Sequence, residues 1–142
     1  MLSLYLLDTN IISEINRKQP NEAIVEKMAC YQAEVCTASP VIHELKFGCL
    51  RLPAESAKRQ FLEDYIEQIP LKMPVFSYDL KAARWHADER ARLTKIGKTP
   101  AFVDGQIASI AFCQNLVLVT RNASDFLEFE GLKLENWFEV DG

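Results

Sequence analysis

Short apolar runs alternate with longer amphipathic segments along the whole chain. The apolar runs predict strands, which are expected at residues 2–7, 33–38, 73–76, 116–120 and 132–137. The segments between them repeat apolar positions with helical spacing and predict helices at residues 9–17, 21–32, 39–50, 54–69, 78–96 and 100–114. Strands that alternate with helices indicate an α/β fold, in which a parallel sheet carries helices on both faces.

Several expected helix ends carry residues that commonly begin or stop a helix. Asn21 stands at the start of the second helix. Ser39 followed by Pro40 predicts an N-cap with proline in the first turn of the third helix. Gly97 is expected to end the long helix that begins near Tyr78. These signals support the segment boundaries that the apolar pattern gives.

The composition is that of a single globular domain, expected to span residues 1–142. Hydrophobic residues make up 49% of the chain and charged residues 25%, which is enough apolar material for a core without cross-links. No stretch is apolar enough to cross a membrane, and the N-terminal apolar run lacks the basic start of a secretory signal. We expect the cysteines, which form no C-x-x-C pair, to be reduced core residues of a cytoplasmic protein: Cys30, Cys36, Cys49 and Cys113.

The formal net charge of −4 argues against a protein that holds nucleic acid over its whole surface. A local basic run nevertheless lies between residues 81 and 98, where six Lys or Arg residues are accompanied by only two acids, Asp88 and Glu89. Such a run is often just the solvated face of a helix. It becomes a candidate for binding nucleic acid only if a functional site lies beside it.

Four acidic residues break the local apolar pattern. Asp8 comes directly after the first strand, and Asp125 follows the fourth strand within a polar segment. Glu44 lies at the edge of the apolar stripe of its helix, and Asp104 shares a helix face with small and apolar residues. Each acid also has an ordinary explanation: Asp8 or Thr9 can cap the helix that follows, and Asp104 suits the dipole of a first helical turn.

Considered as a set, the four acids predict a cluster at one rim of the sheet. In parallel sheets ligands bind beyond the carboxyl ends of the strands, which is where Asp8 is expected. Crowded carboxylates repel one another, which raises the pKa of at least one of them unless cations neutralise the charge. An all-oxygen set of ligands suits Mg²⁺ or Mn²⁺, and such ions can activate a water and steady a phosphate leaving group. The pattern therefore favours hydrolysis of phosphodiester bonds.

The segments that carry these acids resemble the ordered motifs of PIN-domain proteins. The similarity is greatest to the VapC/FitB group, the toxin ribonucleases of bacterial toxin–antitoxin pairs, and it covers essentially the whole chain. The matching stretches, in order, are LLDTN (6–10), SPVIHEL (39–45), TPAFVDGQIASIA (99–111) and LVTRNASDF (118–126). The resemblance implies a three-layer α/β/α sandwich around a parallel sheet of four to five strands.

The resemblance also implies roles for individual residues. The acids that match the family's catalytic and metal-binding residues are Asp8, Glu44, Asp104 and Asp125. The polar residues that would orient these carboxylates and the waters on the metal are Thr9, Asn10, Thr120 and Asn122. Within the basic run, the candidates for contact with the RNA backbone are Arg84, Arg90, Arg92, Lys95 and Lys98.

Members of this group act as endoribonucleases with Mg²⁺ or Mn²⁺, commonly on structured RNA such as transfer RNA. They usually form homodimers, and a small antitoxin of the VapB or FitA type inhibits them by laying a C-terminal segment over the active site. Their complexes bind operator DNA through the antitoxin. The resemblance implies the same partners for this chain: an RNA substrate, a small antitoxin, a second copy of the chain and, through the antitoxin, operator DNA. It implies no association with a membrane. Region 39–69 offers some support for a dimer, because its apolar residues exceed what a short helical hairpin needs: Phe47, Leu50, Leu52, Phe61 and Tyr65.

Two other classes of α/β protein fit the first acid less well. A phosphatase with an aspartate nucleophile should carry a second acid two residues after Asp8, where Asn10 stands. A phospho-acceptor signalling domain should have an acidic pair near the end of the first strand, where Asp8 is alone.

A binding module remains an alternative from a different class. Such a protein would have the PIN fold, would form a DNA-binding regulatory complex with a small antitoxin, and would have little nuclease activity. A degenerate module of this kind is expected to have lost one of the acids, and all four are present. Loss of RNA cleavage on substitution of Asp104, with partner binding intact, would separate the two roles.

Overall fold

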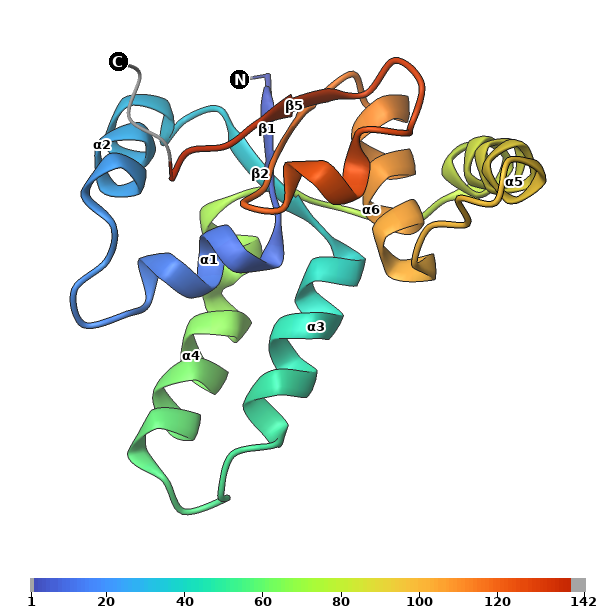
Figure 1. Ribbon diagram of the computed structural model, residues 1–142. Coiled ribbons are helices and arrows are strands. Elements are labelled where there is room, and N and C mark those ends of the chain that lie inside the picture. Colours follow the sequence, from blue (N-terminus) through green and yellow to red (C-terminus); the bar gives the residue numbers. More distant parts are fainter. Residues whose placement is uncertain (1, 139–142) are drawn as a thin grey trace.

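A computed structural model of the protein describes residues 2–138 and contains one parallel sheet with helices on both sides (Figure 1). The strands are β1 (Tyr5–Leu7), β2 (Val35–Ala38), β3 (Val75–Phe76), β4 (Val117–Val119) and β5 (Lys133–Glu135). Their order across the sheet is β3-β2-β1-β4-β5, and every pairing is parallel. Each predicted strand is present in shortened form, so the predicted α/β fold is confirmed.

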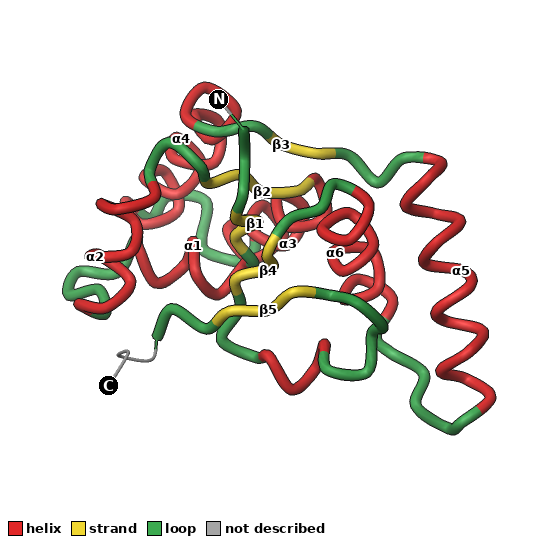
Figure 2. The backbone as a smooth tube through the Cα atoms, turned by 90° about the horizontal axis from the view of Figure 1, so that it is seen from above, coloured by secondary structure: helices red, strands yellow, loops and turns green. Residues whose placement is uncertain are grey.

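The helices form layers on the two faces of this sheet. They are α1 (Thr9–Ile15), α2 (Glu22–Tyr31), α3 (Ser39–Leu50), α4 (Ala57–Lys72), α5 (Leu80–Lys95) and α6 (Phe102–Cys113), with a short 3₁₀ helix, η1 (Ala123–Phe126). Figure 2 shows α1, α2 and α4 on one side of the strands and α6, with α5 outside it, on the other. None of the helices described has the length and apolar character that a bilayer crossing requires.

The core explains why the elements that carry the acids are held rigidly. Leu6 and Leu7 of β1 and Leu118 of β4 are fully buried, since the two central strands are covered on both faces. Helix α6 is composed almost wholly of small and apolar residues and is buried along most of its length. A helix with apolar residues all round fits between other layers, and α5 covers the side of α6 that the sheet does not.

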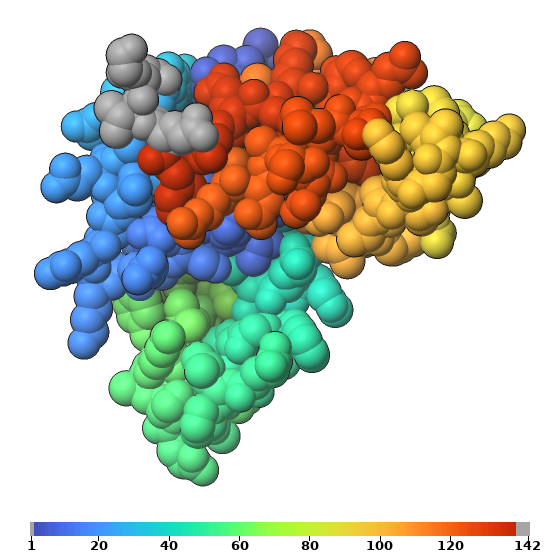
Figure 3. All heavy atoms as spheres, in the orientation of Figure 1, coloured from blue at the N-terminus to red at the C-terminus, as the bar shows by residue number. Residues whose placement is uncertain are grey.

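Helices α3 and α4 form a hairpin that projects from the carboxyl edge of the sheet (Figures 1 and 3). Two of its aromatic residues, Phe47 and Phe61, are 59% and 58% exposed. The sequence predicts more apolar surface in this region than the hairpin needs for itself, and the structure places part of that surface in solvent. Helix α4 continues beyond the predicted end at residue 69 and includes Pro70 in its last turn.

The predicted helix ends are confirmed in two cases and wrong in one. The Asn21 side chain accepts a hydrogen bond from the Ile24 backbone N–H, and Gly97 follows α5 with a φ of +73°. Ser39, however, is the first residue of α3 and not its N-cap. Ala38 occupies the cap position and makes no side-chain hydrogen bond, because β2 runs into α3 without an intervening loop.

The cysteines are all free, as predicted, but they are not all in the core. Cys36 and Cys49 are buried and Cys113 is half-buried. Cys30 lies in solvent on α2, because only one side of that short helix faces the sheet. The prediction of a core position is therefore wrong for Cys30.

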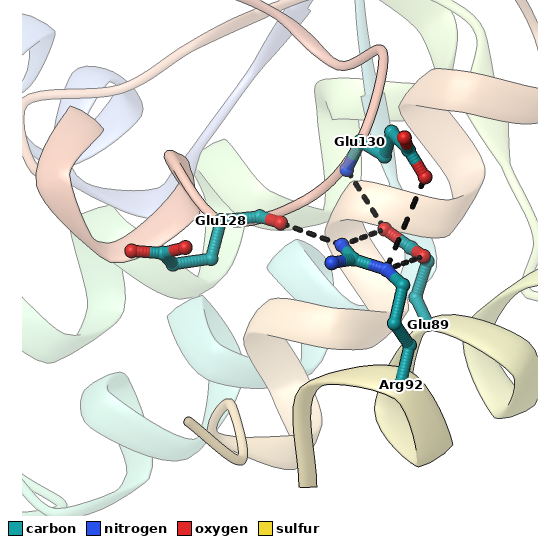
Figure 4. Close-up of polar contacts among 4 residues, drawn as sticks. All are labelled: Glu89, Arg92, Glu128 and Glu130. Carbon is teal, nitrogen blue, oxygen red and sulfur yellow. Dashed lines mark hydrogen bonds and ion pairs between the residues drawn. The ribbon is translucent and has the colours of Figure 1, made fainter. Parts of the chain in front are cut away.

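A network of charged residues fastens the chain that follows η1 to helix α5 (Figure 4). The guanidinium of Arg92 donates two hydrogen bonds to the Glu89 carboxylate, at 2.8 and 2.9 Å, and a third to the Glu128 backbone carbonyl. The Glu130 backbone N–H donates to Glu89 Oε1 at 2.7 Å. This network ties the segment just after Asp125 to a rigid helix.

Glu89→Gln is expected to lower the free energy of unfolding at pH 7 by about 1 kcal/mol, since a charged hydrogen-bond acceptor is lost. Hydrogen bonds from Arg92 hold the pKa of Glu89 below its ordinary value of 4.5, and the Glu130 backbone N–H adds to the effect. The difference in the free energy of unfolding between the unmodified protein and Glu89→Gln should therefore be fully present above pH 4.5. It should vanish as the pH falls through the lowered pKa of Glu89. Urea unfolding across this range measures it, with the exposed Glu67→Gln as control. A difference that persists in acid would contradict the assignment.

Candidate active site

The first predicted acid, Asp8, follows β1 at the carboxyl edge of the sheet and is only 6% exposed. Its backbone N–H donates to the Val119 carbonyl of the neighbouring strand at 2.9 Å. Its carboxylate accepts hydrogen bonds from the Thr9 backbone N–H and from the Thr120 hydroxyl, both at 2.8 Å. Asp8 is also the N-cap residue of α1, so the capping role and a fixed position at the rim hold at once.

The polar residues after β4 fix the orientation of that carboxylate. Thr120 is fully buried, and its hydroxyl oxygen lies 3.1 Å from the Asn122 backbone N–H and 3.4 Å from the Asn10 side-chain amide, both of which donate to it. With both donors in place, the hydroxyl proton is directed at Asp8. Asn10 in turn accepts from the Arg121 backbone N–H at 2.9 Å. Residues more than one hundred positions apart are thereby joined in one network.

The other three acids reach the same rim from three further elements. Glu44 extends from α3 and accepts a hydrogen bond from the Thr9 hydroxyl at 2.8 Å. Asp104 lies half-buried in the first turn of α6. Asp125 is exposed in η1, where its backbone N–H donates to the Asn122 carbonyl. Figure 1 shows α1, α3 and α6 all beginning along the lower edge of the sheet, where β1 ends.

Electrostatic effects show that the four carboxylates share one region. Burial, together with the charges of the other three acids, raises the pKa of Asp104 from 3.8 to about 6. Burial also raises the pKa of Asp8, against the opposing effect of the hydrogen bonds from Thr9 and Thr120. The predicted grouping of acids at one edge of the sheet is thus reflected in their mutual repulsion.

A divalent cation fits the chemistry of these donors. All four acids offer oxygen ligands, the type that Mg²⁺ and Mn²⁺ prefer, and their shared negative charge is the environment that such an ion relieves. Within residues 2–138, no three His, Cys, Asp or Glu side chains are close enough to form a ready metal site. The donors therefore fit the ion in kind, while their spacing is wider than that of a closed coordination shell.

The basic run lies along α5 and divides into two groups. Arg92 and Lys98 are engaged by acids, since Arg92 pairs with Glu89 and Lys98 with Glu128 at 3.0 Å. Arg84, Arg90 and Lys95 are exposed. Of these, Arg90 places its guanidinium 5.3 Å from the centre of the Phe102 ring, close to the start of α6.

Arg121 is a cation at the rim that the sequence analysis missed. Its backbone is held by Asn10, and its guanidinium rests 4.6 Å from the centre of the Phe138 ring. Its position directly after Thr120, within a segment already singled out, is the signal that could have identified it.

A large groove runs away from the acids between α1 and the α3–α4 hairpin. Its volume is about 1740 Å³, and it starts at Thr9 and Glu44. Apolar and aromatic side chains line it further along, including Leu45, Phe61 and Tyr65. Of the four acids, Glu44 lines this groove.

Comparison with known proteins extends these observations. The family model described as PIN domain matches residues 5–132. The VapC ribonuclease Y4jK of Sinorhizobium fredii is 32% identical over 140 residues, which are 96% of this chain and 99% of that protein. The tRNA(fMet)-specific endonuclease VapC of Shigella flexneri is 28% identical over 133 residues, or 94% and 97%. Among solved structures, FitAB bound to an IR36 DNA fragment superposes with a TM-score of 0.85 and 26% identity, covering 98% of this chain and 99% of that one.

Proposed function

Because the chain belongs to the PIN domain family and is a VapC-like toxin ribonuclease, we propose that it hydrolyses phosphodiester bonds of structured RNA, such as tRNA, with Mg²⁺ or Mn²⁺. The observation that carries the proposal is the position of Asp104, whose pKa is raised by burial and also by the charges of Asp8, Asp125 and Glu44. Four separate elements each place one acid at the same rim, and the repulsion between these acids does not help to stabilise the fold. A site that needs a concentrated negative charge does explain it.

Asp8 and Asp104 are proposed to hold the ion, with Glu44 and Asp125 completing the set of ligands. When bound, Mg²⁺ or Mn²⁺ would supply the positive charge that activates a water and steadies the negative charge on the phosphate. Thr120 and Thr9 hold Asp8 and Glu44 in fixed orientations by hydrogen bonds. Asn10 and Asn122 act one step further out by fixing the Thr120 hydroxyl.

We propose a small antitoxin as the regulatory partner and a second copy of the chain as a further one. The large groove supports the antitoxin, because it is open, largely apolar and ends at Glu44. A segment laid along it would cover the acids. The exposed apolar side chains of the hairpin, Phe47 and Leu50 among them, support a homodimer. Contact with operator DNA is assigned to the antitoxin complex, in keeping with the net charge of −4 and with the structure of FitAB on a DNA fragment.

A binding module with little nuclease activity is the second candidate. The similarity to FitAB, whose structure is bound to a DNA fragment, favours it. Retention of all four acids favours catalysis.

Incubation with a total tRNA pool separates the two candidates. Purified protein, free of antitoxin, is expected to make discrete cuts with Mg²⁺ or Mn²⁺ and none with a chelator. If tRNA, ribosomal RNA and messenger RNA all stay intact in the presence of metal, the binding module is the correct interpretation.

Thr120→Val is expected to reduce kcat/KM for RNA cleavage by about 10- to 100-fold, because the Asp8 carboxylate loses the hydrogen bond that orients it. Stability should fall by about 1–2 kcal/mol, since buried polar partners are left unsatisfied. Ser109→Ala is the control, because Ser109 is equally buried and its hydroxyl donates to the Gln106 carbonyl at 2.7 Å, more than one turn of α6 beyond Asp104. Equal losses of cleavage in the two variants would mean that Thr120 has only a structural role.

A further inference from the structure

A second groove lies between α5 and the first turn of α6. Its volume is about 380 Å³, and it is lined by Tyr78, Arg90 and Phe102 together with alanines of α5. It shares no lining residue with the large groove. Phe102 is 49% exposed, and Arg90 lies over its ring. An exposed ring held beside a guanidinium offers flat surfaces on which another planar group can stack.

His86 makes the inner side of this groove rigid. It is 2% exposed, and its Nδ1 shares a hydrogen bond of 2.8 Å with the Tyr78 hydroxyl. Its ring centre lies 4.9 Å from that of Phe102. The opposite edge of the ring rests against Gly105, and Nε2 has no hydrogen-bond partner among the described residues. Tyr78, His86 and Phe102 therefore form an ordered aromatic wall continuous with the turn of α6 that carries Asp104.

The position of the groove relates it to the proposed site of cleavage. Phe102 and Asp104 belong to the same turn of α6, whose pitch is about 5.4 Å. Because residues two positions apart on a helix are about 200° apart around its axis, the two side chains leave α6 on different sides. A strand with its phosphate at Asp104 brings a neighbouring nucleotide to Phe102 by crossing over the start of α6. An RNA backbone also needs a nearby cation to offset the four acids. Arg90 is exposed, and within the described residues it forms no ion pair with a carboxylate, unlike Arg92.

We propose that the groove formed by Tyr78, Arg90 and Phe102 binds an unpaired nucleobase next to the cleaved bond of the RNA substrate. The base stacks against the Arg90–Phe102 pair, and the Arg90 guanidinium also meets the adjoining phosphate. An unpaired base is required, because a base within a duplex is already stacked on its neighbours. The inference rests on the proposed function and adds a subsite that selects single-stranded positions for cleavage.

Binding is measured by fluorescence anisotropy with a labelled anticodon stem–loop of initiator tRNA, in the presence of a chelator so that nothing is cut. Phe102→Leu and Arg90→Gln are each expected to weaken binding about 10-fold, and Phe102→Trp to preserve it. The matched controls are Phe112→Leu, an exposed aromatic residue near the other end of α6, and Arg51→Gln, an exposed arginine that follows α3. Both controls should bind within about 2-fold of the unmodified protein.

A set of stem–loops with one abasic nucleotide at each loop position identifies the base. One abasic position is expected to weaken binding by the unmodified protein as much as Phe102→Leu does, and the two changes together should cost no more than either alone. Fully additive losses would overturn the proposal, as would variants that bind like the unmodified protein.

Two further outcomes are distinguishable. If light scattering shows that Phe102→Leu turns a dimer into a monomer, the groove is covered by a second copy and the proposal is wrong. If the unmodified protein cuts RNA with Mg²⁺ while the groove variants keep full binding, only this inference fails. If it neither binds nor cuts RNA, the proposed function fails as well.

Discussion

Asp104→Asn is expected to abolish RNA cleavage, with a loss of at least about 100-fold in kcat/KM, and at the same time to make the metal-free protein more stable. The loss of activity follows from the proposed role of Asp104 as a ligand of the ion. The gain in stability follows from its surroundings. Burial and three neighbouring acids raise the pKa of this carboxyl to about 6. At neutral pH the carboxyl is therefore charged in surroundings that disfavour the charge, which destabilises the folded protein.

The pH dependence of this gain has a definite sign. The pKa of Asp104 is higher in the folded protein, at about 6, than the ordinary value of 3.8. Folding therefore favours the protonated form, and the stability that this contributes is lost as the pH rises through about 6. Asparagine carries no charge at any pH. The advantage of Asp104→Asn should be small near pH 4 and largest above pH 6, where about 1 kcal/mol, or a few degrees in Tm, is expected after allowance for solvent screening.

Thermal unfolding in chelator, at a series of pH values, measures this effect beside the cleavage assay. Asp64→Asn is the matched control, because it removes the same charge from an exposed position on α4. It should leave both activity and Tm nearly unchanged. Added Mg²⁺ should raise the Tm of the unmodified protein, since an ion that binds only the folded state stabilises it, and should raise that of Asp104→Asn much less. An inactive variant that is no more stable in chelator would contradict the account of crowded carboxylates.

Much of the fold could be predicted from the sequence because the central strands and α6 are apolar throughout. A run such as residues 116–120 has few alternatives once it must be buried on both faces. The start of α3 was less predictable. Ser39 and Pro40 form a common capping pair, but the direct passage from β2 into α3 moved the cap to Ala38. Such a boundary depends on how the strand and helix meet in space, which local residue preferences do not contain.

In the candidate site, too, some residues could be identified from the local sequence, whereas others depend on how distant segments pack. Asp8 and Asp125 could be picked out because each follows an apolar strand, and Asp104 because it interrupts a face of small residues. The three-residue spacing of Glu89 and Arg92 allows an ion pair on a helix. The backbone groups of residues 128 and 130 that hold this pair in place come from a distant segment, so a basic run in the sequence does not reveal them. The aromatic wall behind Asp104 was equally hidden. It joins Tyr78, His86 and Phe102, which come from separate segments and meet only through the packing of α5 on α6.

Gly105→Ala is the second change with a large expected effect, and it tests the contact between α5 and α6 directly. A Cβ atom at this position would lie 2.6 Å from Cδ2 and 2.9 Å from Cε1 of the His86 ring, and closer still to Nε2. The ring has little freedom to move away, because it is buried and tied to the Tyr78 hydroxyl. Alanine ordinarily stabilises a helix relative to glycine by about 1 kcal/mol, but here the clash should dominate and lower stability by about 2 kcal/mol.

Cleavage should also fall by at least about 10-fold in Gly105→Ala, because the turn that is pushed away from α5 carries Asp104. Gly48→Ala is the matched control: it lies in α3, nothing stands within 4 Å of the added atom, and stability should rise by about 0.5–1 kcal/mol. Combining Gly105→Ala with His86→Ala removes the clash, so the double variant should be more stable than the sum of the single effects predicts. Chemical denaturation of the four proteins gives this coupling, and strictly additive losses would show that His86 and Gly105 do not hold α6 in place.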